Sequence, residues 1–230
     1  MWKSRVQRAS YRLCTVPIYF GIFIISGLCY RPVLDDYEKC CTLLVAYRGC
    51  HDVHVTGSLI RTLVIAEDHR NAVHYGVDPL AILRTIKVRI FQGKRQGAST
   101  IEQQLVRTIT GRYEKTPRRK IREQMLAVML NAKFGKEELA SCYLKIAYYG
   151  VSLTGHKGIE RIKSRTSGDS DAVIVAHLKY PKTRSADDLM AKKHMVRVEH
   201  INKLLRNHDA YDAPGSHDPI TFLGRQNKAS

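Results

Sequence analysis

A glutamate at the end of an apolar stretch is the first residue in the sequence that suits catalysis. Four apolar residues precede Glu67 at the spacing of one helix face: Leu59, Ile60, Leu63 and Val64. Apolar surroundings desolvate a carboxyl group and raise its pKa toward neutrality. A carboxyl group with such a pKa can transfer protons at neutral pH. Most charged residues are nonetheless exposed. The spacing alone therefore makes Glu67 a candidate base and no more.

A second glutamate, Glu123, lies in another apolar stretch. Leu126 and Leu130 follow it at spacings of three and seven, and Arg119 precedes it by four. The pattern predicts a helix on which Glu123 is partly buried and paired with Arg119. The alternative is an ordinary exposed pair, which would stabilise the helix by only ~0.2–0.5 kcal/mol.

Three short strings connect these glutamates into one pattern. Residues 67–76 read EDHRNAVHYG, residues 97–104 read GASTIEQQ, and residues 119–123 read RKIRE. In this order they resemble three signatures of the family 51 peptidoglycan glycosyltransferases, E-D-x-x-F-x-x-H-x-G, G-x-S-T-I-x-Q-Q and R-K-x-x-E. The second signature is matched at every fixed position. In the first, Asn71 stands where the family has an aromatic residue.

The resemblance implies a lysozyme-like, all-α glycosyltransferase domain that polymerises lipid II, a lipid-linked disaccharide, in bacterial cell-wall synthesis. Glu67 would be the general base that deprotonates the acceptor hydroxyl, and the reaction would release polyprenyl pyrophosphate with inversion at the anomeric carbon. Glu123 would assist at the donor pyrophosphate. The resemblance fixes no cofactor and leaves open a divalent cation such as Mg²⁺ at that pyrophosphate. The residues that it assigns to substrate binding are Asp68, Ser99, Thr100, Gln103, Gln104, Arg107, Lys115, Arg119 and Lys120.

The fourth signature of the family, K-x-x-I-L-E-x-Y-L-N, is changed in residues 136–145, where Ser141 replaces its glutamate and Lys145 its asparagine. These changes motivate an alternative interpretation, a weak or inactive homologue that serves as a scaffold for lipid II or for cell-wall synthesis proteins. A lysozyme-like hydrolase that uses Glu67 as an acid is a further alternative. Such enzymes commonly need a second carboxylate across the bond, which makes this interpretation the weaker one.

The charge of the chain predicts an anionic partner. Its 38 lysines and arginines exceed its 21 acidic residues, for a net charge of +17. Residues 84–122 concentrate this charge, with twelve lysines and arginines against two glutamates. No zinc-finger spacing, RNP-like aromatic motif or basic leucine-zipper pattern accompanies them, so nucleic acid is not the expected partner. The expected partners are lipid II, the growing glycan strand, the membrane and other cell-wall synthesis proteins.

The N-terminal part of the sequence is typical of a membrane anchor. Residues 13–30 contain no charge and reach the lower length limit of a membrane-spanning helix. Basic residues precede them, which predicts a cytoplasmic N-terminus and an extracytoplasmic body at the bacterial cytoplasmic membrane. A cleaved signal peptide is the alternative, but the run is long and lacks an Ala-x-Ala-like site. Cys40, Cys41, Cys50 and Cys142 would then meet oxidising conditions, in which a disulfide is an open option.

The rest of the pattern is helical, with almost no strand-like alternation. Asp78 before a proline, residues 99–102 in capping-box form and Pro117 predict three helix starts, with Ser99 as the cap of the second. Further helices are expected over residues 58–67, 136–149, 171–178 and 185–206. The predicted organisation is a basic tail (1–12), an anchor (13–30), a linker (31–54), a glycosyltransferase domain (55–210) and a C-terminal tail (211–230). The apolar patch at 40–47 suits either a strand or a helix.

Overall fold

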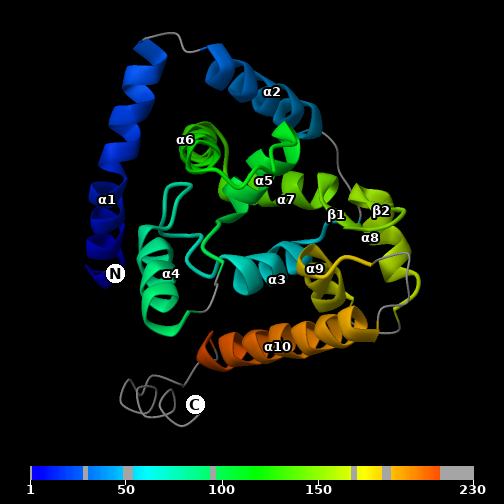
Figure 1. Ribbon diagram of the computed structural model, residues 1–230. Helices are drawn as coiled ribbons and strands as arrows, with labels where there is room; N and C mark the ends of the chain where they lie inside the picture. The colour runs from blue at the N-terminus through cyan, green and yellow to red at the C-terminus, as the bar shows by residue number, and fades with distance from the viewer. Residues whose placement is uncertain are drawn as a thin grey trace.

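The computed structural model describes residues 2–27, 31–48, 54–93, 97–166, 170–182 and 188–212. The expected mainly helical body is confirmed (Figure 1). The elements are α1 (Trp2–Gly27), α2 (Arg31–Arg48), α3 (Gly57–Glu67), α4 (Pro79–Gln92), α5 (Ile101–Thr110), α6 (Pro117–Lys133), α7 (Lys136–Ile146), β1 (Tyr148–Gly150), β2 (Leu153–Thr154), α8 (Gly155–Lys163), α9 (Asp171–Lys179) and α10 (Asp188–Asp212).

Side chains fix the starts of the helices that carry the candidate site. An oxygen of the residue just before each helix accepts a backbone N–H of the first turn, and these caps are Thr56, Asp78, Thr100 and Thr116. The predicted starts of α4 and α6 are therefore confirmed. The prediction for α5 is wrong by one residue, because Thr100 caps the helix and the Ser99 hydroxyl is free for other contacts.

The hydrophobic core surrounds α5, which contacts α2, α6 and α7 (Figure 1). Leu105 of α5, Leu126 of α6 and Leu144 of α7 are at most 1% exposed. A second layer, formed by α3, α9 and α10, packs beneath it and buries Leu63 and Ile201. Each such side chain stabilises the fold by about 1.5–3 kcal/mol relative to exposure. The helices of the site are thus held on a rigid centre.

The segment expected to be a linker contains α2, which answers the question of strand or helix at residues 40–47. Leu44 and Cys40 on α2 are fully buried against the core. Burial raises the pKa of the Cys40 thiol to about 12, which makes it an unreactive apolar group. Cys41 and Cys142 are also free thiols, and Cys50 lies outside the described residues.

The N-terminal helix α1 lies beside α4 and α6 (Figure 1). Tyr11 donates a hydrogen bond to Oδ1 of Asp78 at 3.3 Å, and a side chain on Gly21 would contact Met125 of α6 at 3.7 Å. The helix ends at Gly27, and residues 28–30 of the predicted anchor lie outside the described residues. Within the described ranges, no helix has both the length and the apolarity that crossing a membrane requires.

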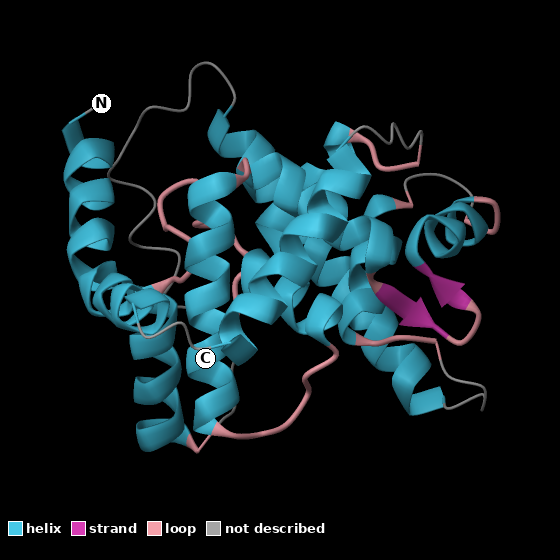
Figure 2. Cartoon of the chain, turned by 90° about the horizontal axis from the view of Figure 1, so that it is seen from above, coloured by secondary structure: helices cyan, strands magenta, loops and turns pink. Residues whose placement is uncertain are grey.

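A small antiparallel hairpin, β1 and β2, was not predicted from the sequence. Tyr148 pairs with Thr154, and Gly150 pairs with Leu153. Figure 2 shows the two strands at one end of the helical body. The strands are only three and two residues long, too short for the alternation by which a strand is recognised in a sequence.

Gly76, the last residue of the first motif, packs against the backbone of α6. Its φ is +87°, and a Cβ atom at this position would lie 2.5 Å from the carbonyl oxygen of Ala127. Gly76→Ala must therefore push the loop away from α6, in addition to ~1–3 kcal/mol of backbone strain. We expect the melting temperature of this variant to fall, by about 2–4 °C for each kcal/mol of unfolding free energy that is lost. Gly57→Ala is the control, since no atom lies within 4 Å of its added Cβ. Equal melting curves for the two variants would contradict the prediction.

Candidate active site

Glu123 is a buried carboxylate at the centre of a cluster of partly buried cations. Its carboxylate accepts hydrogen bonds from Nε and Nη2 of Arg107, each at 3.1 Å, from Nζ of Lys120 at 2.6 Å, and from Nη1 of Arg119. The Glu123 side chain is only 2% exposed. The predicted partial burial and pairing with Arg119 are confirmed, and the structure adds two further cations from the same set of expected residues.

The charges of this cluster strongly affect one another. Burial alone would raise the pKa of Glu123, but the hydrogen bond from Arg107 and the charge of Lys120 hold this pKa below its ordinary value. Burial lowers the pKa of Lys120, and the negative charge of Glu123 opposes that effect. With three cations and one carboxylate, the cluster has a net charge of +2. Such a cluster attracts a doubly negative group such as a pyrophosphate.

Two residues of the second motif hold the same cations from the other side. The Ser99 hydroxyl oxygen accepts from Arg107 Nη2 at 3.2 Å and from Lys120 Nζ at 3.0 Å. Oε1 of Gln103 accepts from Lys120 Nζ at 2.6 Å, and Nε2 of the same residue is buried without a partner in the described part of the chain. The motif thus positions cationic groups as well as starting α5.

Four of the predicted substrate-binding residues lie outside this cluster, namely Asp68, Thr100, Gln104 and Lys115. The hydroxyl of Thr100 is buried, donates to the Gly76 carbonyl oxygen at 2.7 Å and caps α5. Lys115 is exposed, in the segment between α5 and α6.

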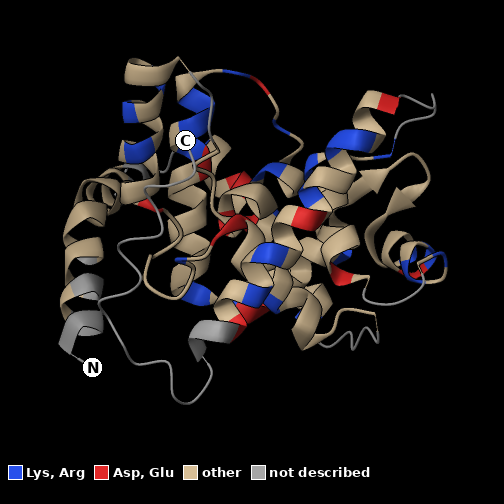
Figure 3. Ribbon diagram, turned by 90° about the horizontal axis from the view of Figure 1, so that it is seen from below, with Lys and Arg blue, Asp and Glu red and all other residues tan. Residues whose placement is uncertain are grey.

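Lysines and arginines are spread over most of the helices, and several acidic residues lie near the centre of the view (Figure 3).

Asp68 connects the first motif to the start of α5. Its buried carboxylate accepts from Nε2 of His74 at 2.9 and 3.0 Å, from Nδ2 of Asn71 at 3.2 Å, and from the backbone N–H of Ile101 at 3.2 Å. Burial alone would raise the pKa of Asp68, but His74, Asn71 and the backbone N–H of Ile101 together outweigh this effect and lower the pKa. Asn71 also donates to Glu102 at 3.4 Å, so a polar contact takes the place of the family's aromatic residue.

Asp68, His74 and Glu102 carry metal-ligating atoms that lie within 4.8 Å of one another. The ammonium group of Lys136 already supplies a positive charge here, at 2.5 Å from Oε1 of Glu102 and 3.2 Å from Nδ1 of His74. A metal ion beside this ammonium group would meet charge repulsion. The arrangement is therefore a buried charge network that fixes the first motif against α5 and α7.

Glu67 is the last residue of α3 and is partly buried. Its side chain is 18% exposed, and Oε1 accepts a hydrogen bond from Nη2 of Arg197 at 2.7 Å. Tyr143 lies within electrostatic reach of both Glu67 and Arg107: burial raises the pKa of its hydroxyl, the charge of Glu67 raises it further and the charge of Arg107 lowers it. The same hydroxyl donates to Oε1 of Gln104 at 2.8 Å. The charges of both Glu67 and Arg107 therefore act on Tyr143, which is hydrogen-bonded to Gln104.

Two residues of this arrangement, Tyr143 and Arg197, were not predicted from the sequence. Tyr143 matches the tyrosine of the fourth signature, and this match could have identified it. Arg197 lies on α10, among many other charged residues, and no local pattern distinguishes it. Only the packing of α10 against α3 reveals its contact with Glu67.

A divalent ion on Glu123 does not fit this geometry. A carboxylate has about four lone-pair positions. Arg107 occupies one position on each oxygen, and Lys120 and Arg119 occupy the remaining two. The surrounding guanidinium and ammonium groups also repel another cation.

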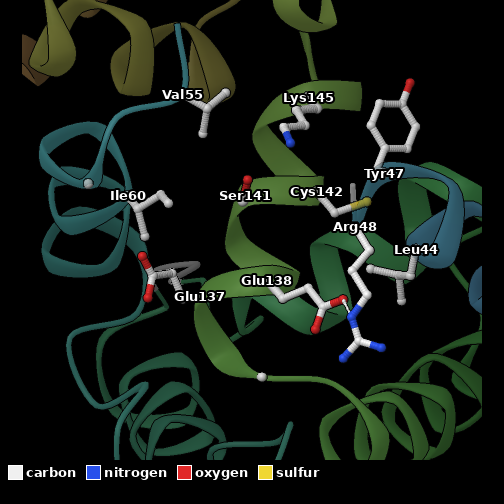
Figure 4. Close-up of a pocket in the computed structure, with 12 residues that line it drawn as sticks. Leu44, Tyr47, Arg48, Val55, Ile60, Glu137, Glu138, Ser141, Cys142 and Lys145 are labelled. Atoms are coloured by element: carbon white, nitrogen blue, oxygen red, sulfur yellow. Dashed lines mark ion pairs between the residues drawn. The ribbon is translucent and has the colours of Figure 1, made fainter. Parts of the chain in front are cut away.

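The altered residues of the fourth signature line a separate pocket of about 540 Å³ (Figure 4). Ser141 and Lys145 project from α7 into this pocket, which Gly57 and Ile60 of α3 border from the other side. Arg48 and Glu138 form an ion pair of 3.1 Å within it. Since Glu67 lies at the opposite end of α3, the two replacements are placed away from the candidate base.

The sequence is similar to those of known proteins. Residues 51–162 match the model of the family described as Transglycosylase. The chain is 33% identical to penicillin-binding protein 1A of Escherichia coli over 148 residues, which are 60% of this chain and 17% of that protein. Penicillin-binding protein 1A of Aquifex aeolicus is 37% identical over 103 residues (44% and 14%) and penicillin-binding protein 1B of Vibrio cholerae 28% over 173 residues (71% and 22%).

The aligned parts thus make up less than a quarter of these relatives. The fold, the site and the comparisons together define a glycosyltransferase domain. More particularly, residues 51–162 belong to the transglycosylase family, family 51 of the glycosyltransferases.

Proposed function

We propose that this protein polymerises lipid II into glycan strands with release of polyprenyl pyrophosphate. The observation that carries the proposal is the pairing of two unlike centres. Glu67 lies at a helix end and can accept a proton, and Glu123 lies in a cluster with net positive charge that suits a pyrophosphate leaving group. The charges of Glu67 and Arg107, one from each centre, both act on Tyr143, which donates a hydrogen bond to Gln104. A transfer from a pyrophosphate donor to a hydroxyl acceptor requires both kinds of centre.

The acceptor half of the reaction takes place at Glu67. Its carboxylate removes the proton from the acceptor hydroxyl, and the oxygen then forms a bond to the anomeric carbon of the donor sugar. The bond from that carbon to the pyrophosphate breaks, and the pyrophosphate leaves with the electron pair. A single displacement of this kind inverts the anomeric carbon.

The donor half of the reaction depends on Arg107, Arg119 and Lys120, whose positive charges stabilise the negative charge that develops on the leaving pyrophosphate. Glu123, Ser99 and Gln103 hold these cations in place. Lys115 is placed to meet a longer substrate from the exposed side. Asp68 and Thr100 position the loop and helix that carry the motifs.

The same proposal includes attachment to the bacterial cytoplasmic membrane. Tyr11 contacts Asp78 of the domain, so a membrane crossing between these two residues is not part of it. The charge-free run at residues 13–30 supports the attachment. On α4, exposed apolar residues alternate with Arg84, Lys87 and Arg89, a composition that suits a lipid interface. The exposed apolar side chains of α4 are Leu80, Leu83, Ile86, Ile90 and Phe91. The growing strand and other cell-wall synthesis proteins are the partners that this location provides.

The test is incubation of the purified full chain with labelled lipid II in detergent. Polymeric glycan, separated by gel electrophoresis, is the expected product. Binding of lipid II without polymer would favour the scaffold interpretation instead. Release of sugars from finished glycan would identify a hydrolase, and either result would overturn the proposal.

A further inference from the structure

We infer that Arg197, on the C-terminal helix α10, is a positioning residue for Glu67. The inference rests on the proposed function, because Glu67 is the base in that proposal. It extends the proposal to a part of the chain that the family match, residues 51–162, does not include. The catalytic unit of this protein would then comprise the matched domain together with α10.

The contact between Arg197 and Glu67 fixes both a side chain and the backbone behind it. Nη2 of Arg197 donates to Oε1 of Glu67 at 2.7 Å and to the carbonyl oxygen of Ala66 at 3.0 Å. Carbonyls in the last turn of a helix lack a partner within the helix. Arg197 supplies one here, so the same nitrogen orients the end of α3 and the carboxylate attached to it.

The position of Arg197 is itself determined by packing. The side chain is only 12% exposed. Ile201, one turn further along α10, is fully buried, and Val198 and Leu205 pack against the same core. On the preceding turn, His194 lies 3.3 Å from the carbonyl oxygen of Val173 on α9. The helix is thus docked on both sides of Arg197, and the guanidinium group has little freedom to move away from α3.

The geometry assigns different tasks to the two oxygens of Glu67. Oε1 is occupied by Arg197, and within the described residues no hydrogen bond reaches Oε2. Oε2 is therefore the oxygen that accepts the proton of the acceptor hydroxyl. Without Arg197, the carboxylate would rotate among several side-chain conformers, and the productive one would be only a fraction of the population.

Arg197→Gln is the variant that tests this role, with Arg206→Gln as the matched control, because Arg206 is an exposed arginine on the same helix. We expect kcat for lipid II polymerisation to fall about 10- to 100-fold in Arg197→Gln, the loss that a small misplacement of a catalytic group causes. KM should stay close to the wild-type value, because Arg197 contacts the base and not the proposed pyrophosphate cluster. Arg206→Gln should match the wild type in both parameters.

Chemical rescue separates positioning from structural damage. In Arg197→Ala, millimolar guanidinium ion should restore part of kcat, and Arg197→Lys should retain more activity than Arg197→Gln. A kcat in Arg197→Gln equal to or above that of Arg206→Gln would overturn this inference alone, as would a loss of kcat that comes with a lower melting temperature and no rescue. Absence of polymer with both the wild type and Arg206→Gln would instead overturn the proposed function, and this inference with it.

Discussion

Replacing Glu67 by glutamine is expected to reduce the rate of polymer formation from lipid II by about 10²- to 10⁴-fold, the usual contribution of a positioned general base. The amide of glutamine cannot take the proton of the acceptor hydroxyl at neutral pH. Its carbonyl oxygen can still accept the hydrogen bond that Arg197 donates to Oε1. The fold should therefore be kept, with a melting temperature close to that of the wild type. Rates are measured with labelled lipid II under conditions in which substrate is saturating.

The matched control for this substitution is Glu160→Gln, which changes an exposed glutamate on α8. It should leave the polymerisation rate unchanged. If Glu67→Gln retained more than about a tenth of the wild-type rate, Glu67 would not be the base, since general-base catalysis contributes at least about 10²-fold. Binding of lipid II by Glu67→Gln should persist, because the cationic cluster around Glu123 is intact in this variant.

The second large effect is expected for Glu123→Gln, which removes the negative charge from among three cations. We expect the free energy of unfolding to fall by about 2–3 kcal/mol, less than the ~3–5 kcal/mol for a fully buried pair. The effect is smaller because Arg107 and Lys120 are 28% and 33% exposed and can turn toward water. The melting temperature should fall by about 4–12 °C for a chain of this size. Polymerisation should decrease roughly 10²-fold, because the cations lose the group that orients them toward the pyrophosphate.

The acidic side of the stability profile gives an independent measurement of the same group. The pKa of Glu123 is lower in the folded protein than in the unfolded chain. The stabilisation by its carboxylate is therefore fully present above the ordinary pKa of 4.5, and is lost as the pH falls from there through the lower folded value. Glu123→Gln should remove this part of the acid dependence. Glu114→Gln, which changes an exposed glutamate 3.8 Å from Arg112, should preserve it, and identical acid profiles for the two variants would refute the assignment.

Local sequence signals predicted most of the helices because the information lies within each helix. Asp78 and Pro117 stand where a cap or a first-turn proline is needed, and both helices begin there. The shift of the α5 cap from Ser99 to Thr100 shows the limit of such signals. Both residues can cap a helix, and the buried contact of Thr100 with the Gly76 carbonyl oxygen, 24 residues away in sequence, determines which one does.

The candidate site was predictable only in part, for the same physical reason. The three motifs identified Glu67, Glu123, Ser99, Arg119 and Lys120 because each lies within a short string. They gave no indication that Glu123 would bind three cations at once, since Arg107 is 16 residues away from it. Arg197 is 130 residues from Glu67. A contact over that distance is determined by the packing of α10 on α3, which no periodicity in the sequence describes.

The two faces of α7 differ in what they contact, and this difference separates two places at which a ligand could bind. Tyr143 faces the candidate site, whereas Ser141 and Lys145 face the pocket shown in Figure 4. A small molecule bound in the pocket would therefore contact Ser141 and Lys145 of α7. It would touch none of Arg107, Arg119, Lys120 and Glu123, which do not line the pocket.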